Sequence, residues 1–159
     1  MNIYIIRHAE PDYEHDSLTE KGWREAELLS HRLSKIRNAF YYTSPLGRAR
    51  DTASLTLRAV GQEAEVLPWL REFDTGYTVP PVYNPKGFGW DFPPKTWTHE
   101  TLYYDPERWL QAPAYRDSGV EPVYRAVTDG LDALLAKHGY ERGDHLYRAV
   151  RPNTENLLL

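Results

Sequence analysis

The N-terminal part of the chain alternates between two hydrophobic patterns. Residues 3–6 are β-branched or aromatic, lack a helical period and stop at Arg7-His8, so they predict a buried strand with polar groups at its end. Apolar side chains then recur every three or four positions over residues 20–36, which predicts a helix with Thr19 as its N-cap. The apolar face of this helix comprises Trp23, Ala26, Leu29, Leu33 and Ile36.

The alternation of strand and helix then repeats. Residues 39–43 predict a second strand, and Ser44-Pro45 opens a second helix that carries Pro in its first turn and runs to about Val60. Residues 63–67 predict a third, short strand. This β-α-β-α-β order predicts an α/β fold of three layers, with a central, mostly parallel sheet flanked by helices.

A proline- and aromatic-rich segment, residues 73–118, interrupts this pattern. Seven prolines and eleven aromatic residues lie between Phe73 and Tyr115, with one short helix expected near residues 106–111. Long insertions of this kind are typical of lids and binding loops. A satellite cluster packed by its own aromatics is an equally good interpretation, and both stay open.

The last part of the chain predicts one more helix and the start of a strand. Residues 121–138 have a helical apolar face, and Gly139 is placed to end the helix. Residues 157–159 are three leucines, which look like the opening of a buried strand. We therefore interpret residues 1–159 as a single domain, incomplete at its C-terminus, with residues 73–118 as a lid-like insertion.

Composition narrows the classes of partner and compartment. The formal charge of −4 without a Lys/Arg run argues against binding nucleic acid or an anionic membrane through bulk electrostatics. The absence of cysteine excludes a disulfide frame, a cysteine nucleophile and a thiolate metal site. The apolar run at the N-terminus is too short for a signal peptide or a membrane span, so we expect a cytoplasmic protein.

Candidate chemistry follows two of the predicted strands. Arg7 and His8 follow the first strand, and Arg48 follows the second. Because the carboxyl ends of parallel strands meet at one edge of a sheet, these side chains can form one anion site. Guanidinium groups suit phosphate through bidentate hydrogen bonds. An imidazole there can attack phosphorus if a backbone carbonyl or similar acceptor holds its other ring nitrogen.

Three motifs resemble those of the histidine phosphatase superfamily, the phosphoglycerate mutase-like proteins. The signature of that superfamily is Arg-His-Gly, Leu-Thr-x-x-Gly and Ser-Pro-Leu-x-Arg-Ala-x-x-Thr-Ala. Here the motifs stand, in the same order, as Arg7-His8-Ala9, Leu18 to Gly22 and Ser44 to Ala53. Two positions depart from the pattern: Ala9 replaces Gly, and Glu14 stands where many members carry a phosphate-binding Asn.

The resemblance implies a phosphoglycerate mutase-like fold and a mechanism without metal or cofactor. It implies that His8 is the nucleophile that becomes phosphohistidine, and that Arg7, His8 and Arg48 bind the phosphoryl group. The Leu-x-Glu-x-x-x-Gly context places the proton donor on Glu72. The superfamily carries a second histidine on the strand after the last long helix, and the chain ends just before that position.

We expect a phosphomonoester phosphatase that acts on a small phosphorylated molecule. A mutase that uses a bisphosphoglycerate and a non-catalytic phosphate or phosphoprotein binder are the alternatives. We expect neither nucleic acid nor membrane as a partner. The remaining histidines are interpreted as surface, capping or core residues: His15, His31, His99, His138 and His145.

Overall fold

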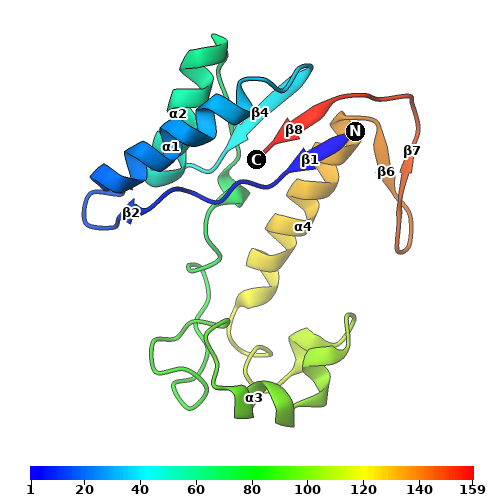
Figure 1. Cartoon of the computed structure of the whole chain (residues 1–159). Helices are drawn as coiled ribbons and strands as arrows, with labels where there is room; N and C mark the ends of the chain where they lie inside the picture. The colour runs from blue at the N-terminus through cyan, green and yellow to red at the C-terminus, as the bar shows by residue number, and fades with distance from the viewer. The chain divides into compact units, whose positions relative to one another are not determined.

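The computed structural model describes residues 1–159, which divide into two compact units (Figure 1). The first unit comprises Met1–Arg71 and Asp132–Leu159, and the second comprises Glu72–Leu131. The second unit contains all of the segment 73–118 that the sequence sets apart, and it extends further at both ends. A lid role for that segment stays a prediction.

The first unit is built on a four-stranded sheet. Its strands are β1 (Asn2–Tyr4), β4 (Ala39–Thr43), β5 (Glu65–Val66) and β8 (Asn156–Leu158), in the order β1-β8-β4-β5. Every neighbouring pair is parallel, with Ile3 beside Leu157 and Phe40 beside Leu157 across the two interfaces of β8. The predicted parallel α/β sheet is therefore confirmed. The strand predicted at the C-terminal leucines is β8, which contains Leu157 and Leu158 and lies between β1 and β4.

Both faces of the central strand β8 are covered. Leu157 and Leu158 point to opposite faces because side chains alternate along a strand, and both are buried. On one face, Leu157 packs with Tyr42 and Leu134. Leu134 comes from α4 (Val120–Lys137), so the last turns of α4 cover this face. Helix α4 closely matches the predicted 121–138 helix, and Gly139 follows it at φ +82°, as expected for a left-handed stop.

Helix α1 (Glu20–Leu33) follows the expected capping but not the expected burial. The hydroxyl of Thr19 accepts a hydrogen bond from the Gly22 N–H at 3.0 Å, which confirms the predicted N-cap. The predicted face is wrong at Trp23, which is 37% exposed. The buried positions are Gly22, Ala26, Ser30 and Leu33, so the prediction is confirmed at Ala26 and Leu33, and the helix ends at Leu33 and not at the predicted residue 36. Small residues at three of these positions let the neighbouring backbone come close, and this rotates Trp23 to the edge of the contact.

Helix α2 (Gly47–Val60) packs against α1 and begins later than predicted. Its N-cap is Leu46, so Pro45 precedes the helix and does not lie in its first turn. The helix ends at Gly61, whose φ of +66° is the left-handed conformation that glycine adopts without strain. Two short antiparallel pairs that the sequence pattern did not predict complete the first unit: β2 (Pro11–Asp12) with β3 (Ser17–Leu18), and β6 (Tyr140–Arg142) with β7 (Tyr147–Ala149).

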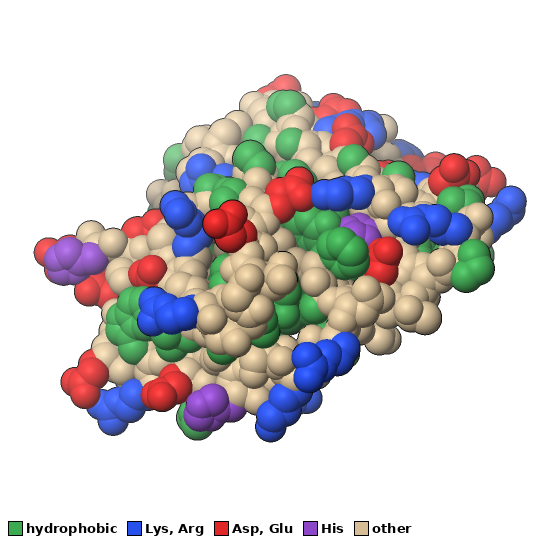
Figure 2. Space-filling model, turned by 90° about the horizontal axis from the view of Figure 1, so that it is seen from above, with side chains coloured by type: hydrophobic (Ala, Val, Ile, Leu, Met, Phe, Trp, Pro, Cys, Tyr) green, Lys and Arg blue, Asp and Glu red, His purple; other side chains and the backbone are tan.

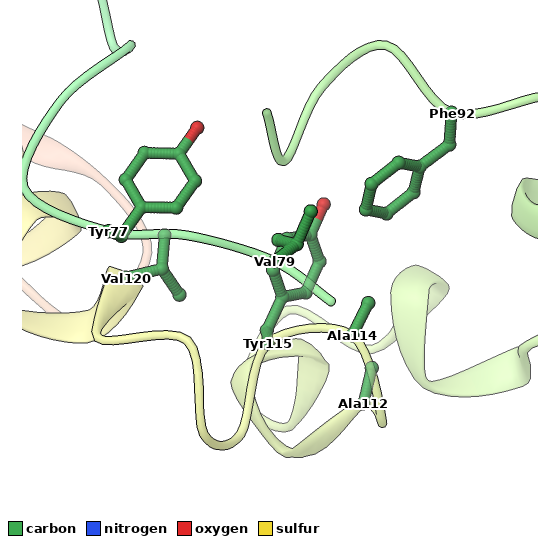
Figure 3. Packing of buried hydrophobic residues seen from close by; sticks show 7 residues of the cluster. All are labelled: Tyr77, Val79, Phe92, Ala112, Ala114, Tyr115 and Val120. Atoms are coloured by element: carbon green, nitrogen blue, oxygen red, sulfur yellow. The ribbon is translucent and has the colours of Figure 1, made fainter. Parts of the chain in front are cut away.

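The second unit has short helices around an aromatic core. Its elements are α3 (Pro94–His99), 3₁₀ turns at η2 (Thr101–Tyr104) and η3 (Trp109–Gln111), and the first part of α4, up to Leu131. A 3₁₀ turn in the first unit, η1 (Pro68–Leu70), precedes it in the chain. The core side chains are Tyr77, Val79, Phe92, Ala112, Ala114, Tyr115 and Val120 (Figure 3). The aromatics of this segment thus pack a core of their own, which favours the satellite-cluster interpretation.

Gly89 fixes one loop of this second core. Its N–H lies 3.3 Å from the Tyr77 hydroxyl, and its carbonyl accepts from the Tyr115 hydroxyl at 2.5 Å. A Cβ at this position would lie 2.9 Å from the Tyr77 ring and 3.0 Å from the Tyr115 ring. Only glycine therefore fits between the two tyrosines without displacing one of them.

Charged side chains of both signs lie on the face of the molecule that Figure 2 presents. Figure 2 shows basic and acidic side chains interspersed on the face that it presents, with hydrophobic side chains between them. The prediction of a buried strand over residues 3–6 is wrong, because β1 comprises Asn2–Tyr4 and the side chains of Ile3, Tyr4 and Ile5 are exposed. None of the helices has the length and apolar character needed to cross a membrane.

Candidate active site

His8 follows β1 in the chain, four residues after Tyr4, the last residue of that strand. The side chain is half-buried, and Nδ1 lies 2.8 Å from the carbonyl oxygen of Ala9. A carbonyl oxygen can only accept a hydrogen bond, so Nδ1 must carry the proton. In the neutral ring, Nε2 is then the nitrogen with the available lone pair. This is the arrangement that a nucleophilic imidazole requires.

Two hydrogen bonds connect the His8 segment to the first turn of α2. The N–H of Ala9 donates to Oγ1 of Thr52 at 3.0 Å. The same Thr52 hydroxyl donates to the carbonyl oxygen of Arg48 at 2.7 Å. Ala9 and Thr52 are both buried, so water competes weakly for these bonds. The structure therefore joins the backbone beside His8 to the backbone of Arg48, as convergence of the two strand ends predicts.

Arg48 is a buried cation held from several sides. Its side chain is 9% exposed, and Nη1 donates to Oδ1 of Asp16 at 2.8 Å. The ring of Tyr13 lies 5.3 Å from the guanidinium carbon, within the range of a cation–π interaction. Both partners belong to the loop that follows His8, so this loop and Arg48 fix each other.

Asp16 also caps α2 from outside the helix. The N-cap residue Leu46 has no side-chain acceptor, and Oδ2 of Asp16 accepts from the Gly47 N–H at 2.6 Å instead. This hydrogen bond is the largest cause of the lowered pKa of Asp16, with the Arg48 guanidinium adding in the same direction. The carboxylate also faces the positive end of the α2 helix dipole, which favours its charged form.

Two glycines pin the loop between His8 and α1. A Cβ on Gly22 would lie less than 3.0 Å from the carbonyl oxygen of Glu10, and a Cβ on Gly47 less than 3.0 Å from that of Asp16. The loop therefore touches the first turns of both helices at positions where only glycine fits. The last residue of the Leu18-Thr19-Glu20-Lys21-Gly22 motif is therefore glycine because a side chain there would collide with the loop backbone.

Side-chain contacts strengthen both anchors. Near α1, the Glu10 carboxylate pairs with Lys21 at 2.5 Å, and this hydrogen bond is the largest cause of the lowered pKa of Glu10. Near α2, the Ser17 hydroxyl donates to Asp51 at 2.6 Å. The loop thus carries side-chain anchors at both ends.

The four predicted catalytic residues lie in two different units. Arg7, His8 and Arg48 belong to the first unit, where Arg7 is exposed and makes no hydrogen bond or ion pair within the chain. Glu72 is the exposed first residue of the second unit, so its role as proton donor to the leaving group stays a prediction. Glu14, which replaces the Asn of many superfamily members, is exposed.

The other histidines lie as a surface or core role predicts. His15, His31, His99 and His145 are exposed. His138 is buried, with Nε2 2.6 Å from the Tyr42 hydroxyl and Nδ1 2.5 Å from Oε2 of Glu155. Its two ring nitrogens are thus used inside the core. No group of three or more His, Asp or Glu side chains in the chain is arranged to hold a metal ion.

Sequence reasoning missed the roles of Asp16 and Thr52. A helix leaves its first N–H groups without partners, and Leu46 has no side chain able to accept from them. An acceptor from elsewhere in the chain was therefore required, and the polar loop after His8 was the available source. Thr52 belongs to a quoted motif, but only the structure shows that its hydroxyl connects Ala9 to Arg48.

Comparisons with known proteins agree with the motifs. Residues 3–79 match the family model of the histidine phosphatase superfamily (branch 1). Two curated relatives have the name probable phosphoglycerate mutase GpmB. The one from Serratia proteamaculans is 35% identical and the one from Cronobacter sakazakii 33% identical, each over 85 residues. Each match covers 48% of this chain and 40% of the relative, so the similarity spans well under half of the relatives' length.

A solved structure shares the fold along almost the whole chain. The structure named mycobacterial hydrolase 1 matches with a TM-score of 0.52 and 21% sequence identity. The match covers 98% of this chain and 72% of that one. Residues 3–79, which carry the strand ends and loops described above, are similar to the histidine phosphatase superfamily, and this match spans slightly less than half of the chain.

Proposed function

We propose that this protein is a phosphomonoester phosphatase that hydrolyses a small phosphorylated substrate through a phosphohistidine on His8. The observation that carries the proposal is the hydrogen bond between His8 Nδ1 and the Ala9 carbonyl, 2.8 Å long. It leaves Nε2 as the nucleophilic nitrogen of the neutral ring.

In the first half of the reaction, Nε2 of His8 attacks phosphorus. A P–N bond forms as the bond between phosphorus and the leaving oxygen breaks, and the transferring phosphoryl group carries negative charge throughout. Arg48 and Arg7 supply permanent positive charge and N–H donors to the phosphoryl oxygens. Phosphoryl transfer depends mostly on such positioning and charge stabilisation.

In the proposed reaction, Glu72 acts first as the general acid and then as the general base. Its carboxylic acid protonates the leaving oxygen, so the first product departs as an alcohol. The resulting carboxylate then takes a proton from a water molecule that attacks the phosphohistidine. The P–N bond breaks, inorganic phosphate leaves, and His8 returns to its neutral form.

The first test is the hydrolysis of p-nitrophenyl phosphate by the wild-type chain and by His8→Ala. We expect turnover in the wild type and none in His8→Ala, with the fold unchanged by circular dichroism. His31→Ala is the matched control, because His31 is exposed on α1 and should leave turnover as it is. Hydrolysis that persists in His8→Ala contradicts the nucleophile assignment. Phosphate binding without turnover in the wild type indicates a non-catalytic binder instead.

A second test looks for the covalent intermediate. Rapid quenching with the same substrate, followed by intact mass measurement, should show one added phosphoryl group that is lost in acid and stable in base, as phosphoramidates are. Arg48→Ala should reduce the rate at which this group appears. Arg50→Ala, two residues along α2 and exposed, is the control and should not.

The name of the two relatives favours one alternative, phosphoglycerate mutase activity. A mutase that uses a bisphosphoglycerate must hold a second phosphate and needs further cations for it. Between residues 74 and 117 the chain has four Lys/Arg against six Asp/Glu, which disfavours a site for a polyanion. Incubation with 3-phosphoglycerate distinguishes the two functions, because a phosphatase releases glycerate and phosphate whereas a mutase forms 2-phosphoglycerate.

A further inference from the structure

The carboxylate of Asp16 makes two contacts with the start of α2. Oδ1 accepts from the buried Arg48 guanidinium at 2.8 Å, and Oδ2 accepts from the Gly47 N–H at 2.6 Å. One short side chain therefore holds both the backbone and the side chain of the segment that the proposed mechanism uses.

We propose that Asp16 is a positioning residue for Arg48: its carboxylate fixes the guanidinium in the orientation that binds the phosphoryl group. This inference rests on the proposed function, since it assigns Arg48 to phosphate. It goes beyond that function because position 16 lies outside the three motifs described above, residues 7–9, 18–22 and 44–53.

The backbone of Asp16 is rigid enough for this task. Its φ of +45° lies in the left-handed region, which Asp and Asn tolerate better than other non-glycine residues. Its carbonyl oxygen lies so close to Gly47 that no Cβ fits at residue 47. The neighbouring hydroxyl of Ser17 is tied to Asp51 of α2. The carboxylate thus projects from a fixed point of the loop toward the first turn of α2, which carries Arg48.

Fixing Arg48 matters because a guanidinium on a long side chain has many rotamers. An Arg side chain loses considerable conformational entropy when it becomes ordered. Because the contact with Asp16 already orders the Arg48 side chain in the free protein, substrate binding does not have to bear this entropy loss. The contact with Asp16 uses Nη1, and a guanidinium has five N–H donors in a planar fork. Orienting one edge of the fork therefore orients the whole plane relative to the phosphoryl oxygens.

Asp16→Asn is the sharpest variant. Asn has nearly the same shape, tolerates the left-handed backbone, and its amide oxygen can still accept from the Gly47 N–H. It removes the charged hydrogen bond to Arg48. We expect kcat/KM for p-nitrophenyl phosphate to fall about 10- to 100-fold, and the dissociation constant of inorganic phosphate to rise, with the thermal unfolding midpoint little changed. Asp12→Asn is the matched control, because Asp12 belongs to the same loop and contacts His15 instead.

A double-mutant cycle separates positioning from a general structural role. If Asp16 acts through Arg48, the combination of Asp16→Asn and Arg48→Ala should be no slower than Arg48→Ala alone. Additive losses would show that Asp16 acts elsewhere and would overturn the proposal. Tighter binding of inorganic phosphate by Asp16→Asn would also overturn it, because the carboxylate would then be a competitor of phosphate.

A spectroscopic readout keeps this inference distinct from the proposed function. A guanidinium held by a carboxylate rotates slowly, so NMR of the wild type should resolve separate Nη–H signals for Arg48 that merge in Asp16→Asn. Resolved signals in a wild type that neither binds phosphate nor hydrolyses the substrate would contradict the proposed function and leave the contact standing. Signals that are the same in both proteins would contradict the inference, whatever the activity.

Discussion

The hydroxyl of Tyr42 lies 2.6 Å from Nε2 of His138, and both side chains are buried. The other ring nitrogen of His138 meets the Glu155 carboxylate at 2.5 Å. Tyr42 belongs to β4, His138 follows α4, and Glu155 precedes β8, so one imidazole connects three parts of the first unit that are far apart in sequence.

Tyr42→Phe should destabilise the first unit. The substitution removes the hydroxyl and leaves Nε2 of His138 buried without a partner, which costs about 1–3 kcal/mol. Urea unfolding followed by far-UV circular dichroism measures the loss. Tyr41→Phe is the control. Tyr41 precedes Tyr42 in β4, is only partly buried and makes no side-chain hydrogen bond, so the change in its free energy of unfolding should stay within about 0.5 kcal/mol. Equal losses in the two variants would show that the Tyr42 bond adds no stability.

Glu155 should make the stability of the protein depend on acid pH. The hydrogen bond from His138 is the largest cause of its lowered pKa, and Asn153 and Arg151 act in the same direction. The unfolded chain therefore binds a proton more readily than the folded one. The contribution of Glu155 to stability is complete above its ordinary pKa of 4.5. This contribution falls as the pH drops below 4.5 toward the lower pKa of Glu155 in the folded protein.

Glu155→Gln tests this dependence. The variant should show a shallower loss of stability below about pH 4.5 than the wild type, as measured by thermal unfolding over a pH series. Glu141→Gln changes an exposed carboxylate on β6 and is the control. If Glu155→Gln loses stability below about pH 4.5 as steeply as the wild type does, other groups cause the pH dependence.

Gly47→Ala tests the packing between the loop and α2. A methyl group at this position has to displace the Asp16 carbonyl, which is backbone and yields poorly. We expect a loss of about 1–3 kcal/mol by urea unfolding, together with weaker phosphate binding. Gly143→Ala is the comparison, because a Cβ there would meet Leu146 at 3.4 Å, an ordinary contact. Stability retained in Gly47→Ala would mean that the loop can shift without cost.

The second strand and the long helices were predictable because their signals are local. The second strand was predicted at residues 39–43 and lies there, since five consecutive strand-forming residues follow a polar turn. Thr19 was predictable as an N-cap for the same reason. The burial of α1 was not, because it depends on the close approach of Glu10 to Gly22, a tertiary contact without a periodic signature.

The candidate site was predictable in its residue types but not in its supports. Parallel strand ends meet at one edge, so Arg7, His8 and Arg48 could be grouped from their positions alone. The carboxylate of Asp16 reaches Gly47 across 31 positions of sequence, and nothing in the spacing of the residues signals that contact. Glu72 is the opposite case. The motif resemblance implies that it is the proton donor, but a motif does not place its side chain relative to His8.

Alkaline pH should weaken the second unit through Tyr103. Burial raises its pKa from 10.0 to about 12, so the folded unit holds the neutral phenol where the unfolded chain would already release the proton. The contribution of Tyr103 to stability is therefore complete below pH 10.0 and is lost as the pH rises toward about 12.

Tyr103→Phe tests this dependence, because it keeps the ring contact with Trp97 and removes the ionisable group. Urea midpoints at about pH 8 and about pH 11 should differ less in this variant than in the wild type. Tryptophan fluorescence is a suitable probe, since three of the five tryptophans lie in residues 72–131. Tyr104→Phe changes the exposed neighbouring residue and is the control, so its urea midpoints should depend on pH as those of the wild type do. If Tyr103→Phe also behaves as the wild type does, burial of the Tyr103 phenol does not govern the loss of stability at alkaline pH.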